Sequence, residues 1–283
     1  MKSLLALLAF FFPAVSTVAE SSSCSRIVSL APSITEVLFE LGLGGNVVGV
    51  TRYCRFPPES TLIKKVGGFF DLNAEAIFSL KPSKVFALGE SDSTIASLKT
   101  LDLSVVTLDH MTVNGIKKSI EIVGRECGVG DRAEKVLADL AVREEQIARR
   151  AKGTKRLKVL VSVGRTRSGS AVSGIYVSGQ DGFYTGVLDL LGAENVNSRK
   201  TIAVPTVSSE GILALNPDAI VEIVNVDDQA DSEAPENFWR QFKAVTAVRD
   251  DRIVEVTTDY GSIPGPRYIL LAEMLAEKLF PAR

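Results

Sequence analysis

Leu72-Asn73-Ala74-Glu75-Ala76-Ile77-Phe78-Ser79-Leu80-Lys81-Pro82 is followed by an apolar run that ends at Leu88. The pattern returns 135 residues later, from Glu75 to Glu210, as Val207-Ser208-Ser209-Glu210-Gly211-Ile212-Leu213-Ala214-Leu215-Asn216-Pro217. Each copy has a polar residue able to cap a helix, a Glu in the first turn and a Pro that ends the helix. The β-branched run after each copy predicts a buried strand.

A glutamate is stable at a helix start because the free N–H groups there carry partial positive charge. Helix stability explains the glutamate of either copy alone. The repetition at matching places in the two halves calls for a second explanation. The helix and its exit at 37–47 also reappear at 187–196, with one deletion. The duplication therefore covers two segments of each half, in the same order.

The order of predicted elements gives the fold class. Residues 26–51 read as strand, helix and strand, a βαβ unit that implies a parallel sheet. Residues 131–151 contain no Gly or Pro and carry one narrow apolar stripe, which predicts a long connecting helix over 130–152. The second half begins with a strand at 157–163, followed by a predicted Gly/Ser-rich loop at 164–179, and closes with a helix at 267–279.

We therefore predict an α/β protein with two Rossmann-like lobes, each with a parallel-type central sheet, joined by a single long α-helix. The N-terminal lobe is expected over 24–129 and the C-terminal lobe over 153–283.

The N-terminus predicts export. Met1 and Lys2 precede an apolar run at 4–12, and small residues follow up to Ala19, as in a secretory signal peptide over 1–19. The mature protein is then expected in the periplasm. A lipoprotein anchored through Cys24 is the alternative, although residues 21–23 lack the Leu usual three positions before a lipidated cysteine.

The three cysteines are Cys24, Cys54 and Cys127. Outside the cytoplasm a disulfide is permitted, and we predict Cys54–Cys127, with Cys24 left over at the mature N-terminus. No C-x-x-C motif is present, which argues against a zinc ribbon.

Composition excludes several functions. Of 283 residues, 46% are hydrophobic and 23% charged, which is typical of a folded globular protein. The net charge of −2 and the lack of a basic tail argue against a nucleic-acid partner. His110 is the one histidine, so it cannot form a multi-histidine metal site, and no G-x-S-x-G, Walker A or dinucleotide motif accompanies it. We expect no enzyme activity, no catalytic residues and no metal site.

A binding protein remains. In α/β domains, ligands collect outside the carboxyl ends of the strands. Aromatic side chains on loops expected there suit a large, flat, partly apolar ligand held between two lobes. The candidate ligand-binding residues are Ser33, Tyr53, Phe69, Phe70, Tyr184 and Tyr260. Alternatively, Phe69 or Phe70 packs into the core of its own lobe.

The chain resembles the extracytoplasmic substrate-binding proteins of ABC importers, in the class whose lobes are joined by one long helix. That class serves vitamin B12, haem and ferric siderophores, and the likeness is greatest to its cobalamin-binding members. The resemblance covers nearly all of the mature chain, through residues 29–36, 49–53, 56–58, the two Glu stretches, 192–196 and 266–267.

The resemblance implies that Glu75 and Glu210 dock on arginines of a dimeric inner-membrane permease, which works with ATPase subunits. It implies a monomer that captures a corrinoid without a resident cofactor. It places Tyr53 and Phe69 in the ligand pocket, whereas the family's two pocket tryptophans are replaced by Val204 and Tyr260.

Two alternatives remain open. A haem or siderophore receptor of the same class could use Tyr53 or Tyr184 as a haem ligand, or Arg165 and Arg167 toward an anionic siderophore. An exported α/β enzyme is the other reading, against which the single histidine argues.

Overall fold

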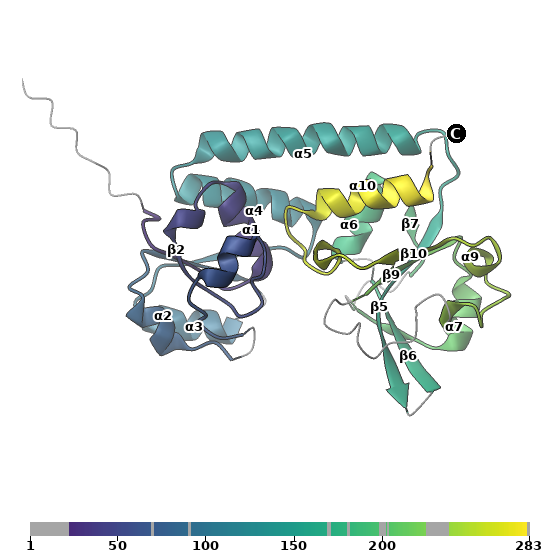
Figure 1. Cartoon of the computed structure of the whole chain (residues 1–283), viewed down its shortest axis with the longest axis horizontal. Coiled ribbons are helices and arrows are strands. Elements are labelled where there is room, and N and C mark those ends of the chain that lie inside the picture. The colour runs from purple at the N-terminus through teal and green to yellow at the C-terminus, as the bar shows by residue number, and fades with distance from the viewer. Residues whose placement is uncertain are drawn as a thin grey trace, which may run out of the picture.

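The computed structural model describes residues 23–68, 71–89, 92–168, 171–179, 182–197, 202, 204–224 and 238–281. Two α/β lobes lie beneath one long helix, α5 (Gly130–Ala151), which crosses from the first lobe to the second (Figure 1). The predicted fold class is confirmed. The expected signal peptide lies outside the described residues.

The first lobe is built on a parallel four-stranded sheet of order β2-β1-β3-β4. Its strands are β1 (Ile27–Ser29), β2 (Val47–Val50), β3 (Lys84–Leu88) and β4 (Val105–Leu108). Its helical segments are α1 (Pro32–Glu40), η1 (Gly44–Asn46), η2 (Pro58–Leu62), α2 (Ala74–Ser79), α3 (Asp92–Thr100) and α4 (Val113–Glu126). Parallel pairing requires crossover connections, which the helices supply.

The second lobe has a mixed sheet of order β10-β9-β5-β6-β8, with β7 paired to β5. Its strands are β5 (Lys158–Ser168), β6 (Ala171–Val177), β7 (Glu194–Asn195), β8 (Thr206–Val207), β9 (Ala219–Ile223) and β10 (Ile253–Val256). Its helical segments include α6 (Phe183–Leu190), α7 (Ser209–Leu215), α9 (Thr246–Arg249), η4 (Asp259–Gly261) and α10 (Tyr268–Leu279).

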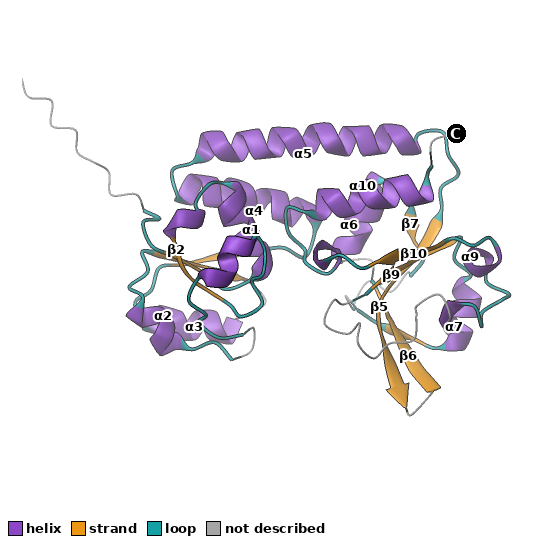
Figure 2. Cartoon of the chain, in the orientation of Figure 1, coloured by secondary structure: helices purple, strands orange, loops and turns teal. Residues whose placement is uncertain are grey.

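The predicted Gly/Ser-rich loop at 164–179 was wrong. β5 continues through Ser168 and pairs antiparallel with β6, so this segment forms a hairpin that extends away from α5 (Figure 2). The many Gly and Ser residues of this segment are typical of a loop, and Gly164 indeed has a positive φ of +153°. Pairing along the hairpin nevertheless holds the backbone extended, since cross-strand neighbours rather than intrinsic preference decide strand formation.

One hydrophobic core runs through both lobes. It joins side chains of α1 and α4 in the first lobe to side chains of α6 and α10 in the second, including Ile34, Leu38, Ile116, Ile120, Val187, Leu188, Leu271 and Leu275. Gly186 of α6 lies so close to Val113 of α4 that an added Cβ would be 3.0 Å from its side chain. The lobes are therefore packed directly on each other as well as tethered by α5.

Helix α5 contacts both lobes. Its buried residues Ala133, Leu140 and Ile147 recur every seventh position, so they lie along one stripe. Arg143 forms a two-point ion pair with Glu273 of α10, at 2.7 Å for each nitrogen–oxygen pair. On the other side Lys117 of α4 lies 3.0 Å from Glu144. In the part of the chain that the structure describes, no helix has the length and apolar character needed to cross a membrane.

The disulfide pairing differs from the prediction. Cys24 is bonded to Cys127, with a Cα–Cα distance of 5.1 Å, within the range that a disulfide requires. Cys54 is free and buried after β2, where its sulfur lies 3.2 Å from the hydroxyls of Thr35 and Thr51. The prediction of Cys54–Cys127 was wrong because it used only compartment and position within the first half. In the fold, Cys127 ends α4 beside the segment that enters β1.

We predict that the unfolded, unreduced mature protein exposes one thiol, that of Cys54, and three after reduction. Replacing both Cys24 and Cys127 by Ser should lower the free energy of unfolding by about 2–5 kcal/mol, because a closed loop of this length restricts the unfolded chain. Thiol titration in denaturant and urea unfolding measure the two effects. Cys54→Ala is the control, since it should keep the disulfide. Three thiols before reduction would contradict the pairing.

Candidate functional site

The two glutamates predicted to dock a permease lie on matching short helices. In α2 the Asn73 side chain accepts the amide of Ala76 at 2.9 Å, and in α7 the Ser208 hydroxyl accepts the amide of Gly211 at 3.3 Å. These are the N-caps that the sequence predicts. Glu75 and Glu210 each stand in the first turn and are exposed.

The equivalence continues beyond the glutamates. The residue two positions after each, Ile77 or Ile212, is fully buried at 0% exposure. Each helix then ends before a residue in the left-handed region, Lys81 at φ +47° and Asn216 at φ +40°. A Pro and a central strand, β3 or β9, follow. The two helices are therefore held on their sheets in the same way, and both lie away from α5 (Figure 1).

The local chemistry around Glu210 favours a carboxylate. Its pKa is lowered because its own backbone amide and the Ser208 hydroxyl donate hydrogen bonds to the ionised form. An exposed, ionised carboxylate on a rigid helix can pair with a cation of another protein.

Ser33 is placed inside the protein, with 3% of its surface exposed. Its hydroxyl lies 2.8 Å from Nδ1 of His110, which is itself 1% exposed. His110 follows β4 in the first lobe, and its buried ring lies close to Pro264 of the second lobe. Its Nε2 has no hydrogen-bond partner among the described residues. The ligand role of Ser33 stays a prediction.

Tyr53 is the most open of the described candidate ligand residues. It follows β2 at the carboxyl edge of the first sheet, and 48% of its surface is exposed. The Arg52 guanidinium carbon lies 5.8 Å from its ring centre. Arg52 also pairs with Asp71, which holds the pKa of that carboxyl below its usual range. Phe69 and Phe70, the other first-lobe aromatics, lie outside the described residues.

Tyr184 and Tyr260 come together in the second lobe. The Tyr184 hydroxyl donates to the carbonyl of Gly261 in η4 at 2.8 Å, and burial raises the pKa of that hydroxyl. Tyr260, the preceding residue, is partly buried against the main core and lines a cavity of about 420 Å³ beside α5 and α10. Neither tyrosine is brought to Tyr53 by any contact that we observe.

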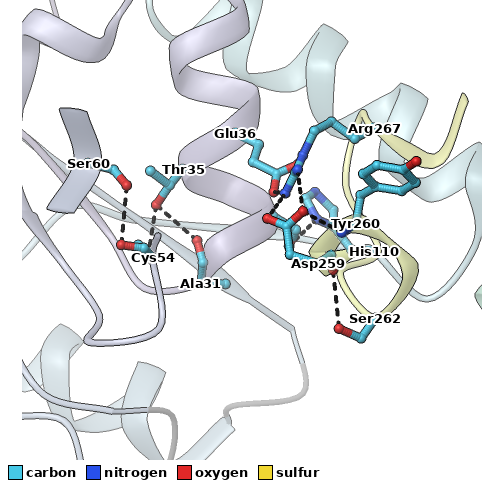
Figure 3. A network of polar contacts seen from close by, with 11 residues as sticks. Ala31, Thr35, Glu36, Cys54, Ser60, His110, Asp259, Tyr260, Ser262 and Arg267 are labelled. Carbon is cyan, nitrogen blue, oxygen red and sulfur yellow. Dashed lines mark hydrogen bonds and ion pairs between the residues drawn. The ribbon is translucent and has the colours of Figure 1, made fainter. Parts of the chain in front are cut away.

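A partly buried ionic cluster joins the lobes around Arg267 (Figure 3). Arg267 makes a two-point contact with Asp259 at 2.8 and 2.9 Å, and its Nη2 donates to Glu36 of α1 at 2.6 Å. Its guanidinium carbon lies 3.9 Å from the ring centre of Phe56 and 5.7 Å from that of Tyr260. The first lobe supplies Glu36 and Phe56, and the second supplies the rest.

Burial and pairing set the charges of this cluster. Burial raises the pKa of Glu36, and the hydrogen bond and charge of Arg267 only partly oppose it. Burial would raise the pKa of Asp259 as well, but its contacts with Arg267 outweigh this and lower it. Burial alone would lower the pKa of Arg267, whereas its two carboxylate partners raise it. Arg267 therefore stays a cation, and one carboxyl group from each lobe is held against it.

Arg165, a candidate contact for an anionic siderophore, already has an anionic partner. It pairs with the buried Glu222 at 2.8 Å and lies 4.3 Å over the ring of Phe238. The indole of Trp239 donates to the same carboxylate at 3.0 Å. The side chain of Arg167 is outside the described part of the chain.

Sequence reasoning did not identify this junction as a functional group of residues. Glu36 and Arg267 both lie in segments that carry the family resemblance, but their 231-residue separation gives no sign that they touch. A glutamate on a helix is usually exposed to solvent, so the sequence gives no reason to expect Glu36 inside the protein. Its burial is visible only in the structure. Among the described residues, no group of three or more His, Cys, Asp or Glu side chains could hold a metal ion.

Comparisons with known proteins agree with this architecture. The family model described as "Periplasmic binding protein" matches residues 27–260. An uncharacterised ABC transporter substrate-binding lipoprotein, YvrC of Bacillus subtilis, is 33% identical, with 90% of this chain and 80% of that protein covered. A vitamin B12-binding protein of Pectobacterium atrosepticum is 27% identical, with 90% and 88% covered. The solved periplasmic haem-binding protein of Pseudomonas aeruginosa superposes with a TM-score of 0.75 at 23% identity, covering 91% and 93%.

The chain belongs to the periplasmic binding protein family, and within it to the substrate-binding proteins of ABC transporters. The predicted family is thereby confirmed. The relatives are transport proteins rather than enzymes.

The buried histidine gives a pH prediction. Burial lowers the pKa of His110 from 6.5 to about 4, with Asp109 opposing only in part. Between these values the unfolded chain binds a proton that the folded protein does not, so stability is full above pH 6.5 and falls as the pH decreases toward 4. At about 1.4 kcal/mol per pKa unit, the loss is of the order of 3 kcal/mol.

Urea unfolding between about pH 7 and pH 4 checks this, with wild type compared with His110→Gln. The variant should lack this component, and no other histidine can supply it. The raised pKa values of Glu36 and Glu222 act with the opposite sign and remain in both proteins. Equal pH dependence of wild type and variant would show that His110 is not held neutral.

Proposed function

We propose that this protein captures a corrinoid between its lobes and delivers it to an ABC permease, on which Glu75 and Glu210 dock. The observation that carries delivery is the pair of exposed glutamates on structurally equivalent helices, both away from α5. The corrinoid is supported by the vitamin B12-binding relatives, which match 90% or more of the chain. Tyr53, exposed at the carboxyl edge of the first sheet, is our candidate for the ligand contact.

Two matched contacts suit a permease made of two equal subunits with ATPase subunits behind it. One carboxylate on each lobe would meet the same cationic site on each subunit. The two carboxylates keep a fixed spacing because the lobes share a core and the Arg267 cluster.

Haem is the second candidate ligand, because haem-binding proteins share this fold. Haem ligation by a tyrosine requires an oxygen that can lose its proton. Tyr184 is poorly suited, since burial raises the pKa of its hydroxyl and Gly261 accepts its hydrogen. If the ligand is haem, Tyr53 is therefore the better candidate for its tyrosine ligand. A siderophore reading through Arg165 is weakened by the ion pair with Glu222.

We further propose that the mature protein is a soluble periplasmic monomer without enzyme activity or a resident cofactor. The relative YvrC is a lipoprotein, and a lipid anchor at Cys24 is the alternative to a soluble protein. The Cys24 sulfur is joined to Cys127, and a sulfur in a disulfide has no bond left for a lipid thioether. This supports release from the membrane after cleavage of the signal peptide.

Thermal unfolding with added ligand tests the corrinoid. Cobalamin at about one hundred times its dissociation constant should stabilise the folded protein by about 2.7 kcal/mol, because only the folded state binds it. Tyr53→Ala should weaken binding, whereas Leu62→Ser, at another exposed position, should not. The same thermal unfolding is measured with haemin, whose binding is also followed by its absorbance. Stabilisation by haemin alone would replace the corrinoid by haem, and no effect of either would remove both ligands.

Permease docking is tested separately with charge variants. Glu75→Gln or Glu210→Gln should leave ligand affinity unchanged and weaken binding to the permease roughly two- to tenfold, most strongly at low salt, since exposed charge pairs are screened. Glu134→Gln on α5 is the control, because this exposed carboxylate lies on the helix opposite the docking helices. Binding to permease-containing proteoliposomes and ligand uptake provide the measurements. Normal binding and uptake by both variants would refute the docking role.

A further inference from the structure

We propose that Phe78 and Leu213 form, with the two glutamates, a duplicated docking surface whose contact with the permease is apolar as well as ionic. The inference rests on the proposed function as an importer subunit and extends it to the chemistry of the partner. Each half of this surface, which we call a docking patch, consists of one glutamate and the apolar residue three positions after it: Glu75 with Phe78, and Glu210 with Leu213.

Helix geometry places both members of a patch on one outward face. Successive helical residues are rotated by about 100°, so positions i and i+3 are neighbours about 60° apart. The residue between them at i+2, Ile77 or Ile212, is fully buried and fixes the rotation of each helix against its lobe. The glutamate and the residue at i+3 are consequently both turned outward, in α2 and again in α7.

Both apolar side chains are open to solvent. Phe78 is 54% exposed and Leu213 is 46% exposed. Exposure by itself would not single them out, because lone apolar residues on a surface are normal, and Leu62 and Val142 are exposed too. The matched position is the distinguishing observation, since two helices 135 residues apart each present a large apolar side chain at the same offset from an exposed Glu.

The same offset in both lobes indicates the kind of partner. A partner that meets both patches must offer the same complementary site twice, as two equal subunits of a membrane protein would. Each site needs a basic side chain for the glutamate and an apolar depression for Phe78 or Leu213. The first patch carries an aromatic ring and the second a smaller branched chain, so we expect the depressions to accept apolar side chains of different shape.

The two parts of a patch should contribute differently. An exposed carboxylate acts on encounter and is weakened by salt. A buried ring or methyl group acts after water is expelled and depends little on salt. The apolar residues should therefore mainly slow dissociation, whereas the glutamates speed association at low ionic strength.

The test uses the double variant Phe78→Ser/Leu213→Ser, the two single variants, and Val142→Ser as the matched control. Val142 is 52% exposed on α5, on the opposite side of the molecule from the docking helices. Affinity is measured for proteoliposomes that contain the permease–ATPase complex, at low and at high salt, with protein-free liposomes alongside. Cobalamin-induced thermal stabilisation verifies folding and ligand binding.

We expect the double variant to bind about tenfold more weakly at both salt concentrations, with each single variant intermediate. Val142→Ser should bind as wild type does. The Glu75→Gln/Glu210→Gln variant should differ from wild type mainly at low salt.

The outcomes separate this inference from the proposed function. If the glutamate variant binds weakly and the apolar double variant normally, the inference is wrong and ionic docking stands. If the glutamate variant and the apolar double variant both bind as wild type does, then the ionic docking role and the apolar contact are both wrong. If the apolar variant loses binding to protein-free liposomes equally, the surface contacts lipid, and the permease is not its partner.

Discussion

The Arg267 guanidinium is the contact on which the arrangement of the two lobes depends. It lies near the rings of Phe56 and Tyr260 and binds one carboxyl group from each lobe, that of Glu36 and that of Asp259. Removing a guanidinium from water is costly, and only close, well-aligned anions offset that cost. Loss of the carboxyl group from either lobe would leave the Arg267 guanidinium without one of its hydrogen-bond partners. Because such a cluster is favourable in one geometry alone, it specifies how the lobes sit on each other.

The surrounding core limits motion in the same way. Apolar side chains of α1, α4, α6 and α10 form one cluster, and His110 and Ser33 add a buried neutral contact where the lobes meet. Separating the lobes would expose this apolar surface and break the ionic cluster together. We expect movements on ligand binding to be small, so that α2 and α7 present their glutamates at nearly constant separation. A partner with two fixed sites could bind such a surface without first ordering it.

The sequence predicted what depends on local pattern. The capped helices with Glu75 and Glu210, the Gly-free helix α5 and the alternation of strands and helices are all written in short segments with strong periodicity. It did not predict what depends on distant partners. The Cys24–Cys127 bond joins residues 103 positions apart, and the hairpin of β5 and β6 needs its cross-strand neighbours. Glu36 and Arg267 were visible only as parts of a resemblance, since desolvation and pairing, rather than residue type, make them a cluster. Among the ligand candidates, Tyr53 stays open, whereas Ser33 is buried and Tyr184 is bonded to η4.

The two lobes have kept different parts of their duplication. Helices α2 and α7 match in N-cap, buried Ile, exposed apolar side chain and left-handed end. The carboxyl edges of the sheets do not match. The first presents Tyr53 beside Arg52. In the second, Arg165 pairs with Glu222 and lies over the ring of Phe238. A partner with two equal subunits is complementary to the same surface on both lobes, whereas a ligand with two unlike faces needs a different surface on each lobe. Matching helices α2 and α7 with differing sheet edges are what a protein would show if a symmetric partner bound at the helices and an asymmetric ligand bound between the lobes.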